Sequence, residues 1–166
     1  MLRHILFTFP FLFFYSGLAQ PSLKKTLERF NTESVPYITV DGLQKNTKLI
    51  VLDTREKEEF QVSHLRKALW VGFKEFEIGK IQKKIPDTSA PIVVYCSIGV
   101  RSEKIGEQLQ NAGYTNVKNL YGGIFEWKNQ GQTVVDSLEN PTERVHAFSK
   151  FWGKLLTKGD KVYALK

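Results

Sequence analysis

The sequence predicts an α/β domain with a central, mainly parallel sheet flanked by helices, and three observations support this. Two short continuous apolar runs, Leu49–Leu52 and Ile92–Tyr95, are rich in β-branched residues, as is typical of strands buried on both faces. Segments with apolar residues at helical spacing alternate with these runs along the chain. The chain has 166 residues, of which 42% are apolar, so it can form one domain with a substantial core.

The remaining elements of the domain follow from the same two patterns. Short β segments are expected at Val35–Val40 and Val117–Leu120. Helices are expected at five segments, namely Leu23–Phe30, Lys57–Val62, Phe73–Lys84, Ser102–Ala112 and Ile124–Asn129. Because parallel α/β sheets bind ligands beyond the carboxyl ends of their strands, the residues that follow each strand are the candidate site.

The first 19 residues have the layout of a secretory signal peptide. A short basic start precedes an apolar run from Ile5 to Tyr15, and small residues lead up to Ala19. We expect cleavage after Ala19 and an exported mature protein, periplasmic or secreted, with no transmembrane span after cleavage. A retained anchor is the alternative, although the run is short for a bilayer span of about 20 residues. The net charge is +7, but the expected export argues against a nucleic-acid partner.

Two flanking regions are expected around a central domain of residues 35–134. Residues 20–34 would form a helical lead-in, and residues 135–166 a helical extension. In that extension the stretch from Thr142, a candidate N-cap, to Leu156 has apolar residues at roughly helical spacing. These residues are Val145, Phe148, Trp152 and Leu155. The pattern predicts an amphipathic helix that packs on the domain, and a helix that binds a partner or a membrane surface is the alternative.

Cys96 is the only cysteine of the chain, so it cannot form an intramolecular disulfide. It directly follows the predicted strand Ile92–Tyr95 and precedes the predicted helix Ser102–Ala112. A short strand–loop–helix connection points successive backbone N–H groups into one concavity, which forms an anion site with the helix N-terminus. Gly99 permits the sharp turn, and Arg101 adds a permanent positive charge. These features predict a lowered pKa for the thiol and a reactive thiolate nucleophile.

Three sequence motifs occur in a fixed order around this cysteine. The first is Asp53-Thr54-Arg55, followed by Glu59-Phe60, His64-Leu65 and Ala68. The second is the loop Cys96-Ser97-Ile98-Gly99-Val100-Arg101. The third is Tyr121-Gly122-Gly123-Ile124-Phe125-Glu126-Trp127. Together they resemble the first signature, the six-residue active loop and the late Gly-Gly…Trp signature of the rhodanese family of sulfurtransferases, over roughly residues 35–134.

The resemblance implies a rhodanese-like fold and a two-step sulfur transfer. Cys96 would attack the outer sulfur of a small anionic donor such as thiosulfate, become a persulfide, and pass that sulfur to cyanide, a thiol or a protein acceptor. Backbone N–H groups would stabilise the developing charge, with Arg101 at the oxyanion end of the donor. The substrate-binding residues implied are Ser97, Ile98, Gly99, Val100, Arg101 and Ser102. No cofactor is implied, and three separated histidines with one cysteine make no recognisable metal site.

The length and composition of the loop separate the alternatives. Four residues lie between Cys96 and Arg101, whereas cysteine phosphatases, including those on the rhodanese-like fold, have a loop one residue longer. The smaller cradle suits a sulfur atom better than a phosphoryl group, which disfavours a phosphatase or an arsenate reductase. Ser97 and Ile98 stand where many sulfurtransferases have an extra basic residue, so the loop is less positive. A non-catalytic module that binds a partner or carries a persulfide is therefore the second hypothesis.

The other motif residues are expected to be structural. Asp53 and Arg55 lie at a strand end, where aspartate caps backbone N–H groups and the opposite charges can pair. His64 is expected to hydrogen-bond within the fold, because an ionised thiolate needs no general base. The pair Gly122-Gly123 is expected to form a tight turn near the active loop, and Trp127 to lie in the core.

Overall fold

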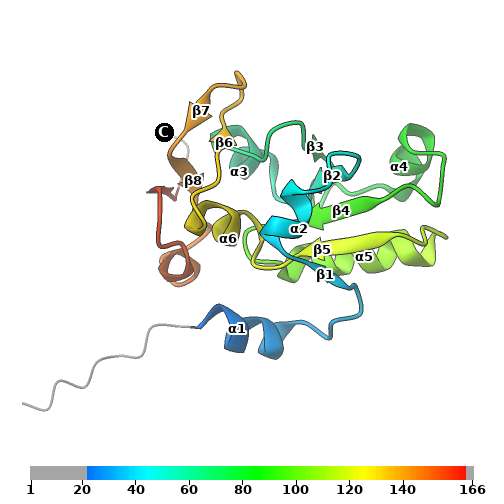
Figure 1. Cartoon of the computed structure of the whole chain (residues 1–166), viewed down its shortest axis with the longest axis horizontal. Coiled ribbons are helices and arrows are strands. Elements are labelled where there is room, and N and C mark those ends of the chain that lie inside the picture. Colours follow the sequence, from blue (N-terminus) through cyan, green and yellow to red (C-terminus); the bar gives the residue numbers. More distant parts are fainter. Residues whose placement is uncertain (1–21, 164–166) are drawn as a thin grey trace, which may run out of the picture.

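The structure is a computed structural model in which residues 22–163 are described (Figure 1). The predicted signal peptide, residues 1–19, lies outside the described residues. Five parallel strands form the central sheet in the order β1-β5-β4-β2-β3. They are β1 (Tyr37–Ile38), β2 (Ile50–Asp53), β3 (Leu69–Trp70), β4 (Ile92–Tyr95) and β5 (Val117–Leu120). The predicted α/β class with a parallel sheet is confirmed.

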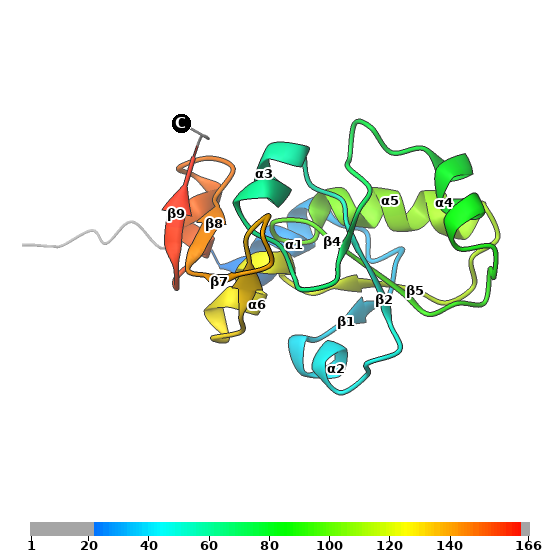
Figure 2. The same ribbon diagram turned by 90° about the horizontal axis from the view of Figure 1, so that it is seen from above.

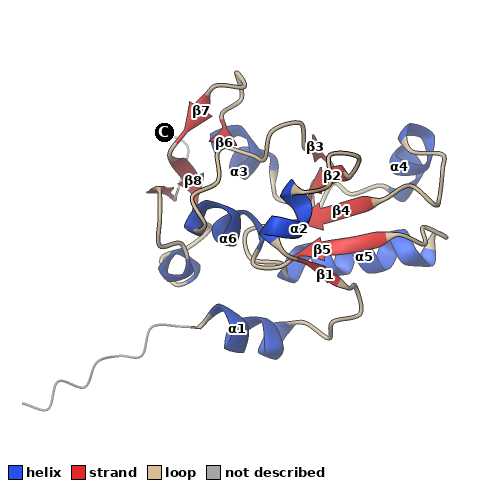
Figure 3. Cartoon of the chain, viewed as in Figure 1, coloured by secondary structure: helices blue, strands red, loops and turns tan. Residues whose placement is uncertain are grey.

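Helices cover both faces of this sheet (Figure 3). They are α1 (Leu23–Phe30), α2 (Val40–Gln44), α3 (Lys57–Val62), α4 (Ile78–Lys84), α5 (Val100–Asn111) and α6 (Gly123–Asn129). Every side chain of the central strand β4 is buried, and successive side chains point to opposite faces. Val93 and Tyr95 therefore join a first core cluster with α2 and α6, whereas Ile92 and Val94 join a second cluster with α4 and α5.

Two predicted elements are shorter in the structure than in the sequence analysis. The β segment expected at Val35–Val40 is reduced to β1, because the Thr39 hydroxyl accepts a hydrogen bond from the Gly42 N–H at 3.1 Å and caps the start of α2. The helix expected from Phe73 begins only at Ile78. Phe73 and Phe76 lie in the loop before α4 and pack against the second core cluster. Their spacing in the sequence resembles that of a helix face, but it arises from this packing.

The prediction of an amphipathic helix from Thr142 to Leu156 is wrong. The structure instead has β7 (Pro141–Thr142), β8 (Arg144–His146), the 3₁₀-helix η1 (Trp152–Leu155) and β9 (Asp160–Val162). Strand β9 pairs in parallel with β8, and β7 pairs with β6 (Val134–Val135) in an antiparallel hairpin. Phe148 has a φ of +60°, which is incompatible with a right-handed helix. The many β-branched and aromatic residues also have low helix propensity.

Residues 141–163, termed here the C-terminal segment, pack tightly on the domain. Val145 and Leu156 are fully buried in the first core cluster. Asn129 of α6 anchors the chain further, because its side chain donates to the Leu155 carbonyl at 2.9 Å and accepts from the Thr157 N–H at 2.7 Å. Figure 2 shows the segment beside α3 and α6. Across residues 22–163, no helix is both long and apolar enough to cross a bilayer.

Candidate functional site

Cys96 lies at the carboxyl edge of the sheet, in the loop between β4 and α5. It is only 1% exposed, yet its side chain borders a pocket of about 100 Å³. The loop contributes four more lining residues, and the C-terminal segment contributes two. These residues are Ser97, Ile98, Val100, Arg101, Phe148 and Trp152. The structure therefore brings the predicted nucleophile together with most of the predicted loop residues in one small cavity.

Gly99 shapes the loop around the cysteine sulfur. Its φ of +110° is one that residues with a side chain rarely adopt. In this conformation its N–H donates to Cys96 Sγ at 3.2 Å. Its carbonyl accepts from the side-chain amides of Asn31 at 3.0 Å and Asn119 at 2.8 Å. Side chains that precede and follow the loop in the sequence thus hold its turn in place.

The Gly122-Gly123 pair supports the back of the same loop. Gly123 has a φ of +54°, and a Cβ atom there would lie 2.2 Å from the Cys96 carbonyl oxygen. Only glycine allows the start of α6 to approach the loop this closely. In return, the N–H groups of Ile124 and Phe125 donate to the carbonyls of Cys96 at 3.0 Å and Ser97 at 3.1 Å. The tight turn predicted here is a direct support of the nucleophile.

The environment of Cys96 favours its thiolate form. Burial raises the pKa of the Cys96 thiol, but the positive charge of Arg101 and hydrogen bonds from Ser102 and Gly99 outweigh burial and lower the pKa overall. The Ser102 hydroxyl also lies 2.8 Å from Asn119 Oδ1, so its single hydrogen can serve only one of these acceptors at a time. A thiol that loses its proton more readily supplies more thiolate, the form that attacks a sulfur atom entering the pocket.

Arg101 does not point freely into the pocket, because Glu59 of α3 holds it. Its Nη1 lies 2.6 Å from Glu59 Oε2 and its Nη2 lies 2.8 Å from Glu59 Oε1, a bidentate pair. The Ser97 hydroxyl donates to the same carboxylate at 3.2 Å and accepts from Arg101 at 3.0 Å. Burial raises the pKa of Glu59, but the bonds and charge of Arg101 lower it overall. The guanidinium that lines the pocket is thus paired with a carboxylate that does not line it.

A second pair, Asp53 and Arg55, lies below the loop and does not line the pocket. Both side chains are fully buried, and Arg55 Nη2 lies 2.6 Å from Asp53 Oδ2. The Arg55 N–H is capped by Asp53 at 2.9 Å, and the Tyr95 hydroxyl also donates to Asp53. Arg55 reaches on to the Ser63 carbonyl at 2.6 Å. These contacts join the end of β2 to β4 and to the end of α3.

The remaining motif residues lie outside the pocket. The ring nitrogens of His64 each lie 3.1 Å from a neighbour, Nδ1 from the Phe60 carbonyl and Nε2 from Glu139 Oε1. Trp127 packs against the first core cluster but is only partly buried, and its indole N–H donates to the Thr133 carbonyl at 2.9 Å. Within the described residues, 22–163, no group of His, Cys, Asp and Glu side chains is arranged to hold a metal ion.

Three residues of the site were not identified as such from the sequence: Glu59, Phe148 and Trp152. Glu59 was part of the first motif, but nothing local shows that it pairs with an arginine 42 positions away. Phe148 and Trp152 were assigned to the apolar face of a helix that does not form. For Glu59, its place in the first motif was the only feature of the sequence that could have indicated a role at the site. No feature of the sequence indicated that Phe148 and Trp152 line the pocket.

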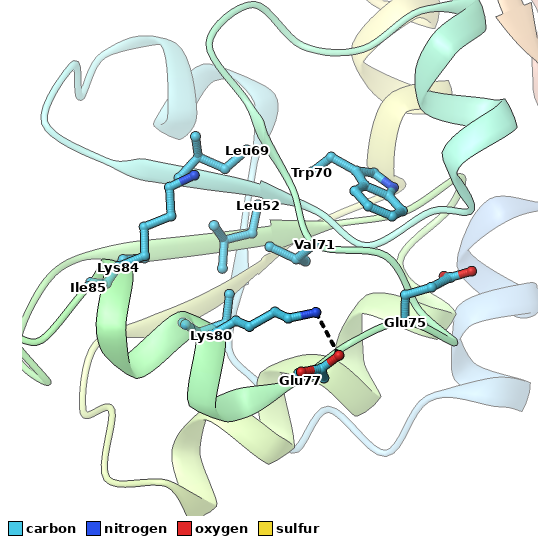
Figure 4. A pocket seen from close by; sticks show the side chains of 10 residues that line it. Leu52, Leu69, Trp70, Val71, Glu75, Glu77, Lys80, Lys84 and Ile85 are labelled. Atoms are coloured by element: carbon cyan, nitrogen blue, oxygen red, sulfur yellow. Dashed lines mark hydrogen bonds and ion pairs between the residues drawn. The ribbon is translucent and has the colours of Figure 1, made fainter.

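A larger cavity of about 280 Å³ lies at the other side of β2, between β3 and α4 (Figure 4). Its lining is mainly apolar, from residues such as Leu52, Val71 and Ile81. Lys80 and Glu77 pair across 2.6 Å at its mouth, as the dashed line in Figure 4 shows. It contains no nucleophile and shares no lining residue with the Cys96 pocket. The smaller pocket is therefore the candidate site, because it holds the reactive group.

Comparison with known proteins agrees with this geometry. Residues 39–130 match the rhodanese-like domain family. The chain belongs to this family. The thiosulfate sulfurtransferase GlpE of Coxiella burnetii is 27% identical over 98 residues, which cover 58% of this chain and 87% of GlpE. The match to this rhodanese-like domain ends before the C-terminal segment, so Phe148 and Trp152 lie beyond it.

Longer proteins and solved structures also resemble this rhodanese-like chain. The adenylyltransferase and sulfurtransferase UBA4 of Candida albicans is 30% identical over 105 residues, which cover 60% of this chain. The match spans only 24% of UBA4. The crystal structure of a rhodanese-related protein from Thermoplasma volcanium superposes with a TM-score of 0.52 at 28% identity, covering 60% of this chain and 97% of that one. Relatives named as sulfurtransferases thus share the domain that carries Cys96.

Proposed function

We propose that this protein is an exported sulfurtransferase that carries sulfur as a persulfide on Cys96. The observation that supports this most strongly is a thiol of lowered pKa at a residue that lines a small pocket, with the Gly99 N–H donating to its sulfur and Arg101 in the same lining. Membership of the rhodanese-like family and the likeness to GlpE support the same chemistry.

The proposed reaction has two balanced steps. The Cys96 thiolate attacks the outer sulfur of thiosulfate, the S–S bond of the donor breaks, and sulfite leaves with the electron pair. The product is the persulfide Cys96–S–S⁻, whose charge the loop N–H groups and Arg101 stabilise. Cyanide or an acceptor thiolate then attacks the terminal sulfur, and the Cys96 thiolate is released. No proton has to move in either step, so the reaction needs no general base.

A persulfide carrier that serves a protein acceptor is the second candidate. The observation that favours it is the bidentate pair of Arg101 with Glu59, which leaves little net positive charge for a small doubly charged donor. A carrier accepts one sulfur and holds it until a partner arrives, whereas an enzyme turns over with small acceptors.

One experiment separates these candidates. The mature protein and Cys96→Ala are incubated with thiosulfate, and intact mass records any added sulfur, which reports on Cys96 because it is the only cysteine. Cyanide is then added and thiocyanate is measured over many turnovers. Persulfide with continuous thiocyanate supports the enzyme, and persulfide with a single release supports the carrier. Absence of added sulfur on the wild-type protein, with thiosulfate and also with an organic thiosulfonate as the donor, excludes both.

The proposed export rests on the first 19 residues and has its own test. We expect protein recovered from the periplasm or the medium to begin at Gln20, as the mass of its N-terminal peptide would show. Recovery of that protein with Met1 still attached would contradict cleavage after Ala19.

A further inference from the structure

The Cys96 pocket has one wall that does not belong to the family match. Phe148 and Trp152 come from the C-terminal segment, whereas the match ends at residue 130. Ile98 and Val100 of the loop also line the pocket and add further apolar surface. The entrance to the nucleophile is therefore lined by aromatic and aliphatic side chains, which is an unusual setting for a small, strongly hydrated anion.

Contacts with the rest of the fold hold this aromatic wall in place. Ala147, next to Phe148, is fully buried, and its N–H donates to the Val162 carbonyl at 2.7 Å. The ring of Trp152 packs edge-on against Phe30 of α1, with ring centroids 5.5 Å apart. The wall is thus formed before a ligand arrives, and a ligand pays little entropy to use it.

Phe148 itself has a strained backbone conformation and an exposed ring. Its φ of +60° is strained for an aromatic residue, and 49% of its surface remains exposed. The guanidinium carbon of Arg101 lies 4.9 Å from the centre of its ring. Strained backbone that presents an apolar ring to solvent beside a nucleophile points to a ligand contact rather than to core packing.

The charge balance around the sulfur favours a donor with less charge than thiosulfate. The Cys96 thiolate and Glu59 carry two negative charges, and Arg101, which is shared between them, carries one positive charge. A doubly charged donor therefore meets a net negative site, whereas a singly charged donor is repelled less. Replacing one anionic oxygen of the donor by an apolar group also matches the aromatic wall.

We propose that the C-terminal segment makes this site selective for sulfur donors that carry an apolar organic group, namely thiosulfonates of the form R–SO₂–S⁻. This inference rests on the proposed function. The outer sulfur reaches Cys96 in the pocket of about 100 Å³, while the group R lies against Phe148 and Trp152 at the entrance. The thiolate forms a bond to that sulfur, the S–S bond of the donor breaks, and the sulfinate R–SO₂⁻ leaves with the electron pair. The Cys96 persulfide is the same as with thiosulfate.

The test compares three donors on three proteins. Benzenethiosulfonate and methanethiosulfonate have the same charge but differ in apolar area, and thiosulfate has neither an organic group nor the single charge. Each is assayed for kcat/KM with cyanide on the wild-type protein, on Phe148→Asn and on Leu138→Ala. Asparagine tolerates a positive φ, so Phe148→Asn removes the ring without adding backbone strain. Leu138 is a matched apolar control, because it is 78% exposed and lies outside the pocket.

We expect Phe148→Asn to lower kcat/KM for benzenethiosulfonate by about fivefold to tenfold, as loss of one aromatic contact does. Methanethiosulfonate and thiosulfate should change by less than about twofold, and Leu138→Ala should leave all three values unchanged. An equal loss for all donors, or no loss for benzenethiosulfonate, would overturn the selectivity while the sulfur transfer stands. If no donor places sulfur on wild-type Cys96 by intact mass, the proposed function itself fails.

Discussion

The molecule contains two arginine–carboxylate pairs at the same edge of the sheet, and they differ in burial and in range. Asp53 and Arg55 are two positions apart in the sequence, and both side chains are 0% exposed. Glu59 and Arg101 are 42 positions apart, with side chains 3% and 16% exposed. Only the second pair has a member in the Cys96 pocket.

The difference shows that the same ionic chemistry has two consequences, depending on where the pair lies. A fully enclosed pair holds neighbouring elements together, and loss of one partner leaves an uncompensated charge in the core. A pair at a pocket wall sets the charge that a substrate meets, and its arginine also stabilises the thiolate of Cys96. We therefore expect changes in the first pair to alter stability alone, and changes in the second to alter reactivity as well, because Arg101 lines the pocket.

The largest effect is expected from Asp53→Ala. Arg55 would remain fully buried without its carboxylate, so the free energy of unfolding should fall by about 3–5 kcal/mol. Urea unfolding followed by circular dichroism measures this. Asp41→Ala, at an exposed position in α2, is the control and should cost less than about 1 kcal/mol. A similarly small loss for Asp53→Ala would show that the enclosed pair is not what holds β2 to its neighbours.

Arg101→Met should instead act mainly on the thiol. Without the positive charge, the pKa of Cys96 rises, so less thiolate is present at neutral pH and alkylation by iodoacetamide slows by about tenfold. The midpoint of the rate against pH should move to higher pH, and mass spectrometry follows the labelling. Arg66→Met, at a half-exposed arginine outside the pocket, should leave the curve in place. An unmoved curve in Arg101→Met would mean that the Gly99 and Ser102 hydrogen bonds lower the pKa without help.

The smallest effect is expected from Glu59→Gln. The amide oxygen can still accept a bond from Arg101, but the negative charge that neutralises Arg101 is removed, so the KM for thiosulfate should fall by about threefold. Steady-state thiocyanate formation measures it. Glu58→Gln, an exposed neighbour in α3, removes the same charge away from the pocket. A rise in KM for Glu59→Gln alone would show that the orientation of Arg101 matters more than its neutralisation.

The family domain was largely predictable because its signals are local. Lys57–Val62 and Val117–Leu120 have the bounds expected from apolar spacing and buried runs. The strand Ile92–Tyr95 is followed directly by Cys96 and its glycine-containing loop, so the position of the nucleophile at the carboxyl edge follows from the order of elements. The pairing of Asp53 with Arg55 was also accessible, since two residues separated by one position at a strand end remain close in any fold.

The C-terminal segment was mispredicted because the helix-like spacing of its apolar residues does not come from a helix. Val145, Phe148, Trp152 and Leu155 recur as a helix face would, but two of them fill the core and two line the pocket. Strand β8 forms only because β9, whose paired residues lie 16 positions further on, supplies its hydrogen bonds. No window of the sequence contains that information.

The sequence by itself determined the α/β class, the position of Cys96 at the carboxyl edge of the sheet and the loop that surrounds it, because strand, loop and helix follow each other directly along the chain. Only the tertiary structure decided which carboxylate neutralises Arg101 and which side chains form the entrance to Cys96. Both depend on contacts between residues more than 40 positions apart, such as Glu59 with Arg101 and Phe148 with Arg101. Such contacts arise from how the elements pack, which local propensity and spacing do not encode.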